Sequence, residues 1–164
     1  MTPEAVRWLL MVLVFPLWIA AGLADWACHR RSGIERSSGL PENLFHWVLF
    51  AELGMAALAV ALLEVNAAVL LVVAGAFVAH ELTTYVELRY AVPRRPVGPV
   101  EQMVHSFQEL LPLVMLALLA VAAWDQVTAL VVAGPADFSL RLKEQPWPPA
   151  SLLGLALAVL ACNV

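Results

Sequence analysis

The chain has 164 residues, of which 62% are hydrophobic and 13% are charged, and its mean hydropathy is +0.83. Ordinary soluble domains carry about 25% charged residues, so this composition indicates an integral membrane protein and excludes a soluble domain. The net charge is −4, and the nine basic residues are scattered along the chain. This distribution excludes a continuous basic surface for nucleic acid.

The apolar stretches predict an all-α bundle of four transmembrane helices that forms a single domain over residues 1–164. The predicted spans are residues 5–27, 42–63, 67–90 and 100–124, each long enough to cross roughly 30 Å of hydrocarbon. Pro16 and Pro112 lie inside two of these spans and are expected to kink them. The first stretch lacks the basic start and the cleavage site of a signal peptide, so we interpret it as a retained membrane helix.

A shorter apolar segment covers residues 150–162 near the C-terminus. A regular transmembrane helix needs about 20 residues, so this segment is too short to be one. Two interpretations remain open, a truncated fifth helix and a re-entrant segment.

The distribution of arginines predicts the orientation of the bundle. Basic residues concentrate after the first and third spans, and the positive-inside rule places both loops in the cytoplasm. The N-terminus and the second turn are then expected outside. The arginines that carry this inference are Arg30, Arg31 and Arg36 in the first loop and Arg89, Arg94 and Arg95 in the third.

All four histidines of the chain belong to groups that also contain a carboxylate. Spacings of i, i+4 and i, i+7 place both members of a group on one face of a helix. The predicted topology brings all four groups to the cytoplasmic half of the bundle. The groups are Asp25 with His29, Glu42 with His46, His80 with Glu87, and Glu101 with His105.

Ionisable side chains inside a membrane are costly and normally face the bundle interior. Four imidazoles and four carboxylates are enough to hold two transition-metal ions, and four-helix bundles build dinuclear carboxylate sites from Glu and Glu-x-x-His inputs. The spacing here is x3 rather than x2, so the pattern is not the ferritin-like motif. This donor set favours iron, with zinc and manganese as alternatives, while the lack of thiolate and thioether donors argues against copper(I). Cys28 and Cys162 form no cysteine-type zinc motif.

Each group also has an interpretation that needs no metal. Glu42 and Glu101 lie in the first turn of their helices, where the helix dipole favours an acid. The acids of the other two groups can pair with loop arginines, Asp25 with Arg30 and Glu87 with Arg94 or Arg95. Taken one at a time, the groups favour these structural roles, whereas four coincident groups favour a metal site.

Two further acids are candidates for catalytic residues. Glu109 continues the stripe of Glu101 and His105 one turn deeper, and Glu52 lies in the middle of the second span. Each has three open interpretations: a deeper ligand, a proton carrier, or a hydrogen-bonded structural acid.

Several short motifs resemble a group of small bacterial inner-membrane proteins of unassigned function. They are Ala24–Arg30, Ile34-Glu35, Glu42-x3-His46, His80-Glu81, Arg94-Arg95-Pro96 and Glu101-Gln102-x2-His105-Ser106. The resemblance covers about residues 20 to 145 and implies a multi-pass protein of the bacterial inner membrane. Some members of the group are labelled diguanylate cyclases, but this chain has no Gly-Gly-Asp/Glu-Glu-Phe loop and no soluble α/β domain.

The leading functional hypothesis is a membrane-embedded di-iron oxidoreductase that acts on a lipid or another apolar substrate and receives electrons from a donor. A zinc-dependent lipid hydrolase is the second enzyme hypothesis, with His29, His46 and His105 holding the ion. The non-enzymatic alternatives are haem binding, through His46 and His105 for example, and metal sensing or transport.

Overall fold

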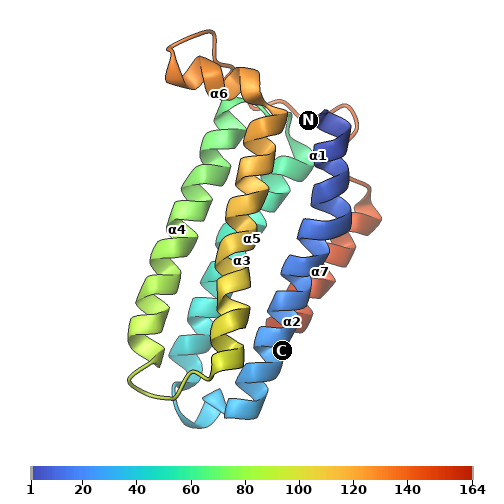
Figure 1. Cartoon of the computed structure of the whole chain (residues 1–164). Coiled ribbons are helices and arrows are strands. Elements are labelled where there is room, and N and C mark those ends of the chain that lie inside the picture. The colour runs from blue at the N-terminus through green and yellow to red at the C-terminus, as the bar shows by residue number, and fades with distance from the viewer. Residues whose placement is uncertain (1, 164) are drawn as a thin grey trace.

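The protein is a bundle of helices in the computed structural model, which describes residues 2–163 and contains no β-strand among them. Four of its helices are long and apolar enough to cross a membrane: Glu4–Ser32, Gly39–Leu62, Ala67–Ala91 and Pro99–Ala122. Consecutive long helices run in opposite directions (Figure 1). The predicted all-α bundle of four membrane-spanning helices is therefore confirmed.

The first long helix contains an irregular turn next to Pro16. It consists of α1 (Pro3–Leu9), a π-helical turn (Leu10–Val14) and α2 (Phe15–Ser32). The N–H of Phe15 donates to the carbonyl of Leu10, five residues earlier. Because proline has no N–H and its ring clashes with the carbonyl four residues before it, a wider turn accommodates it within a continuous helix.

The helix α2 extends five residues beyond the predicted end of the first span at residue 27. Gly33 ends it with φ 65° and ψ 51°, and the N–H of Gly33 donates to the carbonyl of His29. Glycine adopts this left-handed conformation at little cost. The added turn makes His29 a helical residue on the same face as Asp25.

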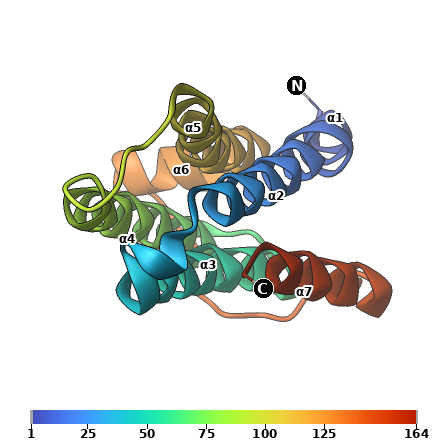
Figure 2. The same cartoon turned by 90° about the horizontal axis from the view of Figure 1, so that it is seen from below.

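The remaining long helices are α3 (Gly39–Leu62), α4 (Ala67–Ala91) and α5 (Pro99–Ala122). The side-chain oxygen of Asn66 caps α4 by accepting from the N–H of Val69, and α5 starts with proline at its first position, where no N–H is needed. The helix α2 packs against α5, and α3 packs against α4, which also contacts α5 (Figure 2).

Two shorter helices complete the chain. The helix α6 (Trp124–Val131) lies across the end of the bundle opposite the arginine-rich loops, and α7 (Pro149–Asn163) packs along α2 and α3 (Figures 1 and 2). The segment between them is tied to the bundle, since Lys143 Nζ donates to the carbonyl of Val60 at 2.6 Å. The apolar segment predicted at residues 150–162 is thus a helix on the flank of the bundle.

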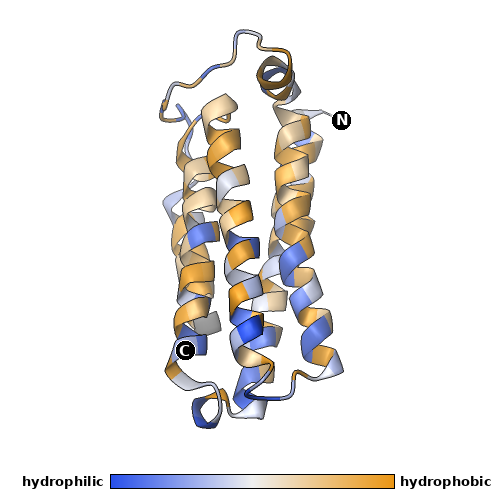
Figure 3. Cartoon of the chain, turned by 90° about the vertical axis from the view of Figure 1, so that its left-hand side faces the viewer, coloured by the Kyte–Doolittle hydropathy of each residue, from blue (hydrophilic) through white to orange (hydrophobic). Residues whose placement is uncertain are grey.

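The polarity of the bundle is the reverse of that in a soluble protein. Large apolar side chains such as Leu71, Leu82 and Leu110 are exposed, as expected for helices that face hydrocarbon. Polar residues gather in one half of the bundle (Figure 3). The apolar core occupies the other half and comprises Ala56, Val69, Leu70, Val73, Leu119 and Ala123.

Candidate metal centre

The buried polar residues meet where four helix ends converge. The helices α2 and α4 end there, and α3 and α5 begin there (Figure 1). Within residues 2–163, two groups of side chains could each hold a metal ion. The donor atoms of each group lie within 4.8 Å of one another. The first donor group is Asp25, His29, Glu101 and His105, and the second is His29, Glu42 and His46.

The first donor group joins α2 to α5. Nε2 of His105 lies 3.0 Å from Oδ1 of Asp25, and Nε2 of His29 lies 3.2 Å from Oε1 of Glu101. Within α2, Nε2 of His29 is 3.5 Å from Oδ1 of Asp25. Asp25, His29 and Glu101 are buried. Two imidazoles and two carboxylates therefore face one another across the helix pair with little access to solvent.

The second donor group joins α2 to α3 and reaches α4 through Glu87. Nε2 of His29 lies 3.8 Å from Oε1 of Glu42, and Nε2 of His46 lies 3.0 Å from Oε1 of Glu87. The rings of His29 and His46 stack with centroids 4.5 Å apart. The two donor groups are thus adjacent and share His29, and together with Glu87 they bring seven of the eight predicted ligands into one cluster.

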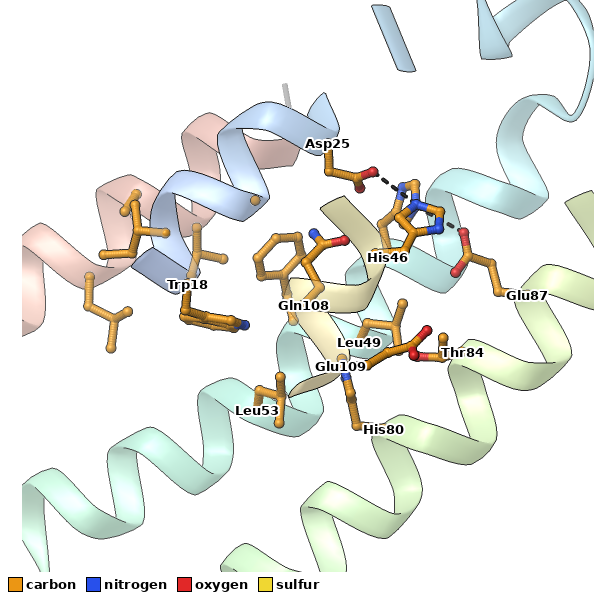
Figure 4. Close-up of a pocket in the computed structure, with 17 residues that line it drawn as sticks. Trp18, Asp25, His46, Leu49, Leu53, His80, Thr84, Glu87, Gln108 and Glu109 are labelled. Atoms are coloured by element: carbon orange, nitrogen blue, oxygen red, sulfur yellow. Dashed lines mark hydrogen bonds and ion pairs between the residues drawn. The ribbon is translucent and has the colours of Figure 1, made fainter. Parts of the chain in front are cut away.

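His80, the eighth predicted ligand, belongs to neither donor group. It is buried on α4, seven residues before Glu87, which corresponds to roughly 10 Å along a helix. The spacing places both side chains on one face but too far apart for one ion. His80 instead lines a cavity that continues from the cluster, where it lies near Glu109 and Thr84 (Figure 4).

Arg95 is a central residue that the sequence analysis did not place in the site. It is buried, with a relative exposure of 5%, although it lies in the loop between α4 and α5. Its Nε donates to both carboxylate oxygens of Glu42, at 3.0 and 3.2 Å, and its Nη1 lies 2.7 Å from Oε1 of Glu101. Burial opposes the charge of Arg95, but the hydrogen bonds to these two carboxylates outweigh it and raise the pKa of the guanidinium.

The charge balance of the sequence does indicate that an arginine such as Arg95 is buried in the cluster. Four acids are predicted in the bundle interior, and buried charges are normally paired, so at least one loop arginine is expected to be buried with them. The short Arg94-Arg95-Pro96 segment directly joins two helices that carry candidate ligands. Spacing rules address only residues on one helix, so they do not show which loop arginine folds inward.

Three other arginines at this end, Arg30, Arg89 and Arg94, contact aromatic rings. The guanidinium carbon of Arg30 lies 5.1 Å from the ring centroid of Trp26, and that of Arg94 lies 3.7 Å from the ring centroid of Tyr90. Such cation–π contacts are favourable near an interface. In the part of the chain that the structure describes, the acids considered as their partners contact histidines instead: Asp25 contacts His29 and His105, and Glu87 contacts His46.

The cluster has the two properties expected of a cation site. First, the donor atoms of Asp25, His29, Glu101 and His105 lie within 4.8 Å of one another, and three of these four residues are buried. Second, four buried carboxylates face a single buried guanidinium, so the cluster has a formal excess of three negative charges when its histidines are neutral. Buried charge of one sign requires protons or cations for compensation. The residues therefore fit a bound metal ion.

The two predicted catalytic acids lie deeper in the bundle. Glu109 lines the cavity together with His80 and Thr84. Glu52 does not line the cavity; its Oε1 accepts a hydrogen bond of 2.8 Å from the hydroxyl of Thr83 on α4. Glu109 is therefore in direct connection with the space below the donor groups, whereas Glu52 links α3 to α4.

Comparison of the chain with protein-family models, curated proteins and solved structures finds no match.

Proposed function

We propose that the chain is a membrane metalloprotein with a dinuclear iron centre, and that it acts as an oxidoreductase on a lipid or another apolar substrate. The observation that carries this proposal is the convergence of three histidines and four buried carboxylates, which has a net negative charge when the histidines are neutral. Iron, when bound, would supply redox chemistry that side chains alone lack. An electron donor is then a required partner.

The geometry supports a division of the ligands between two ions. Asp25, His29, Glu101 and His105 would hold one ion. Glu42 and His46, which belong to the second donor group, would hold the other together with Glu87, which contacts His46. A neutral imidazole has one free lone pair, so His29 serves only one of them. Ionised carboxylates have about four acceptor positions, which lets Glu42 and Glu101 contact Arg95 and an ion together.

The protein's own residues would position the substrate and handle protons. Arg95 would fix the orientation of Glu42 and Glu101, as partners behind metal ligands generally do. Glu109 would carry a proton between the cavity and the cluster, because its side chain lines the space directly below the donor groups. The helices would exclude bulk water from this space.

A zinc-dependent lipid hydrolase is the second candidate function. It is favoured by the proximity of three imidazoles, since the ring centroids of His29 and His105 lie 6.3 Å apart and His46 stacks on His29. Three histidine ligands with an adjacent acid are typical of catalytic zinc. Haem binding has less support, because carboxylates surround these rings and haem ligation does not use them.

We further propose that the centre lies on the cytoplasmic side of the bacterial inner membrane, with the N-terminus outside. The exposed arginines Arg31, Arg36 and Arg89 flank the same end of the bundle as the donor groups. This distribution supports the orientation through the positive-inside rule.

Elemental analysis of the purified protein tests the proposed function. We expect two equivalents of iron in the unmodified protein and loss of metal in His46→Ala and His105→Ala. Ser106→Ala is a matched control, because Ser106 is exposed and, within residues 2–163, its hydroxyl bonds only to the carbonyl of Gln102. Zinc in place of iron would favour the hydrolase. Absence of bound metal after metal-supplemented expression would refute a metalloprotein.

A further inference from the structure

A cavity leads from the metal centre into the membrane-embedded part of the bundle. Its polar end is formed by residues of the cluster, including Asp25, His46 and Glu87. Its other end is apolar and includes Trp18, Phe50 and Leu53 (Figure 4). A ligand that fills this cavity must therefore have a hydrocarbon portion at the apolar end and must extend as far as the cluster at the other.

The helix α7 forms part of the apolar wall through Leu155, Ala158 and Val159. It packs against both α2 and α3 (Figure 2), whereas α2 and α3 make their extensive contacts with α5 and α4. Within residues 2–163, α7 is thus the element that covers the side of the cavity between α2 and α3.

The helix α7 is suited to a mobile cover within the membrane. It has 15 residues, too few to span a bilayer. Its outer side is apolar, since Leu153, Leu157 and Leu160 are exposed. It begins at Pro149, two residues after Trp147, whose N–H donates to the carbonyl of Ala61, so the part of α7 beyond this anchor can move away from α2 and α3 while the contacts among the four long helices remain.

We propose that the cavity binds a single hydrocarbon chain of a lipid, which enters from the bilayer between α2 and α3, and that α7 covers this entrance. Against Trp18, Phe50 and Leu53 a polar solute would lose its hydration without regaining hydrogen bonds, although His80, Thr84 and Glu109 also line the cavity. A hydrocarbon chain keeps an apolar environment when it moves from the bilayer to these apolar side chains. Chemical conversion of the chain rests on the proposed function, but its binding does not require a metal.

Photolabelling in membranes tests the proposed binding site. The probes are a fatty acid and a phosphatidylglycerol, each with a diazirine in the middle of an acyl chain, and labelled residues are mapped by mass spectrometry. We expect label on Trp18, Phe50 and Leu53. Labelling by the fatty acid alone would identify a free acid as the ligand, and labelling by both probes would identify the acyl chain as the recognised unit.

Two tryptophan substitutions on α7 provide a matched pair. Ala158→Trp fills the cavity, while Ala156→Trp adds the same side chain at an exposed position outside it. We expect Ala158→Trp to reduce cavity labelling at least about tenfold, equivalent to roughly 1.4 kcal/mol of binding free energy. Ala156→Trp should leave it unchanged. Ala158→Leu is a smaller change and should reduce cavity labelling partially. It replaces Ala158→Trp in the test if the tryptophan variant does not fold.

Label confined to outward-facing residues such as Leu153 and Leu157, or equal labelling of the two tryptophan variants, would overturn the inference. Metal content measured on the same samples separates this outcome from failure of the proposed function. Cavity labelling in a protein without metal refutes the metal centre alone, and bound metal without cavity labelling refutes the chain-binding site alone.

Discussion

Arg95 connects the loop between α4 and α5 to both donor groups. Its guanidinium lies between Glu42 on α3 and Glu101 on α5, and all three side chains are buried. Arginine suits this position because its planar group bonds two carboxylates in fixed directions and stays charged. One residue thereby offsets part of the negative charge and aligns two candidate ligands.

We expect Arg95→Ala to lower the free energy of unfolding by about 3–5 kcal/mol, the usual cost of removing one partner from a buried ion pair. The remaining carboxylates would be buried without their shared partner. Thermal unfolding in detergent, followed by circular dichroism, measures the change. Arg31→Ala is the control, since Arg31 is exposed, and it should change the free energy by less than about 0.5 kcal/mol.

Arg95→Lys separates charge from geometry at this position. Lysine keeps the positive charge but not the planar fork, so we expect stability between those of the unmodified protein and Arg95→Ala. Equal stability of Arg95→Ala and Arg31→Ala would show that the buried pair contributes nothing.

The ends of the helices determine where the ligands lie. His29 is in the last turn of α2, and Gly33 ends that helix in a left-handed conformation while bonding to the carbonyl of His29. Glu42 and Glu101 lie in the first turns of α3 and α5, where an acid also interacts favourably with the helix dipole. Helix termination and ligand position are therefore coupled at this end of the bundle.

We expect Gly33→Ala to destabilise the protein by about 1 kcal/mol, because a Cβ is unfavourable at φ 65°. Gly54→Ala should have the opposite sign. Gly54 is inside α3 and a Cβ there meets no atom within 4 Å, so alanine should stabilise by roughly 0.5–1 kcal/mol. Unfolding of both variants under the same detergent conditions gives the two values, and a shared sign would contradict the conformational explanation.

At the scale of the whole molecule, the sequence was sufficient to predict the bundle. Long apolar stretches separated by polar turns define helices in a membrane, because the backbone must satisfy its own hydrogen bonds there. Positions i and i+4 share a helix face, which is why pairs such as Asp25/His29 and Glu101/His105 were found. Opposite directions of successive helices then brought them to one end.

Other features depend on contacts that a single helix does not encode. The inward position of Arg95 depends on the path of a loop, and the distance of His80 from the donor groups depends on rise along α4. The placement of α7 on α2 and α3 depends on packing between distant parts of the chain. The π-helical turn before Pro16 is one of several ways in which a helix accommodates proline.

The proposed orientation predicts which loops are accessible from each side of the membrane. In a protein whose own cysteines are replaced, Ser37→Cys lies at the arginine-rich end and Gln145→Cys at the opposite end, and both positions are exposed. We expect an impermeant maleimide to label Gln145→Cys in intact spheroplasts and Ser37→Cys only after lysis. The reverse pattern would place the donor groups on the outer side.

Removal of metal should loosen one end of the bundle and leave the other unchanged. When its histidines are neutral and no cation is bound, the cluster has an excess of three negative charges, so repulsion would favour fraying of the four helix ends there. A ligand at 100 times its Kd stabilises the folded state by about 2.7 kcal/mol. After chelation, hydrogen exchange should therefore accelerate in residues 25–46 and 87–105, but not around Val69, Val73 and Leu119 in the apolar core. Uniform acceleration along the chain would indicate global destabilisation and contradict a localised centre.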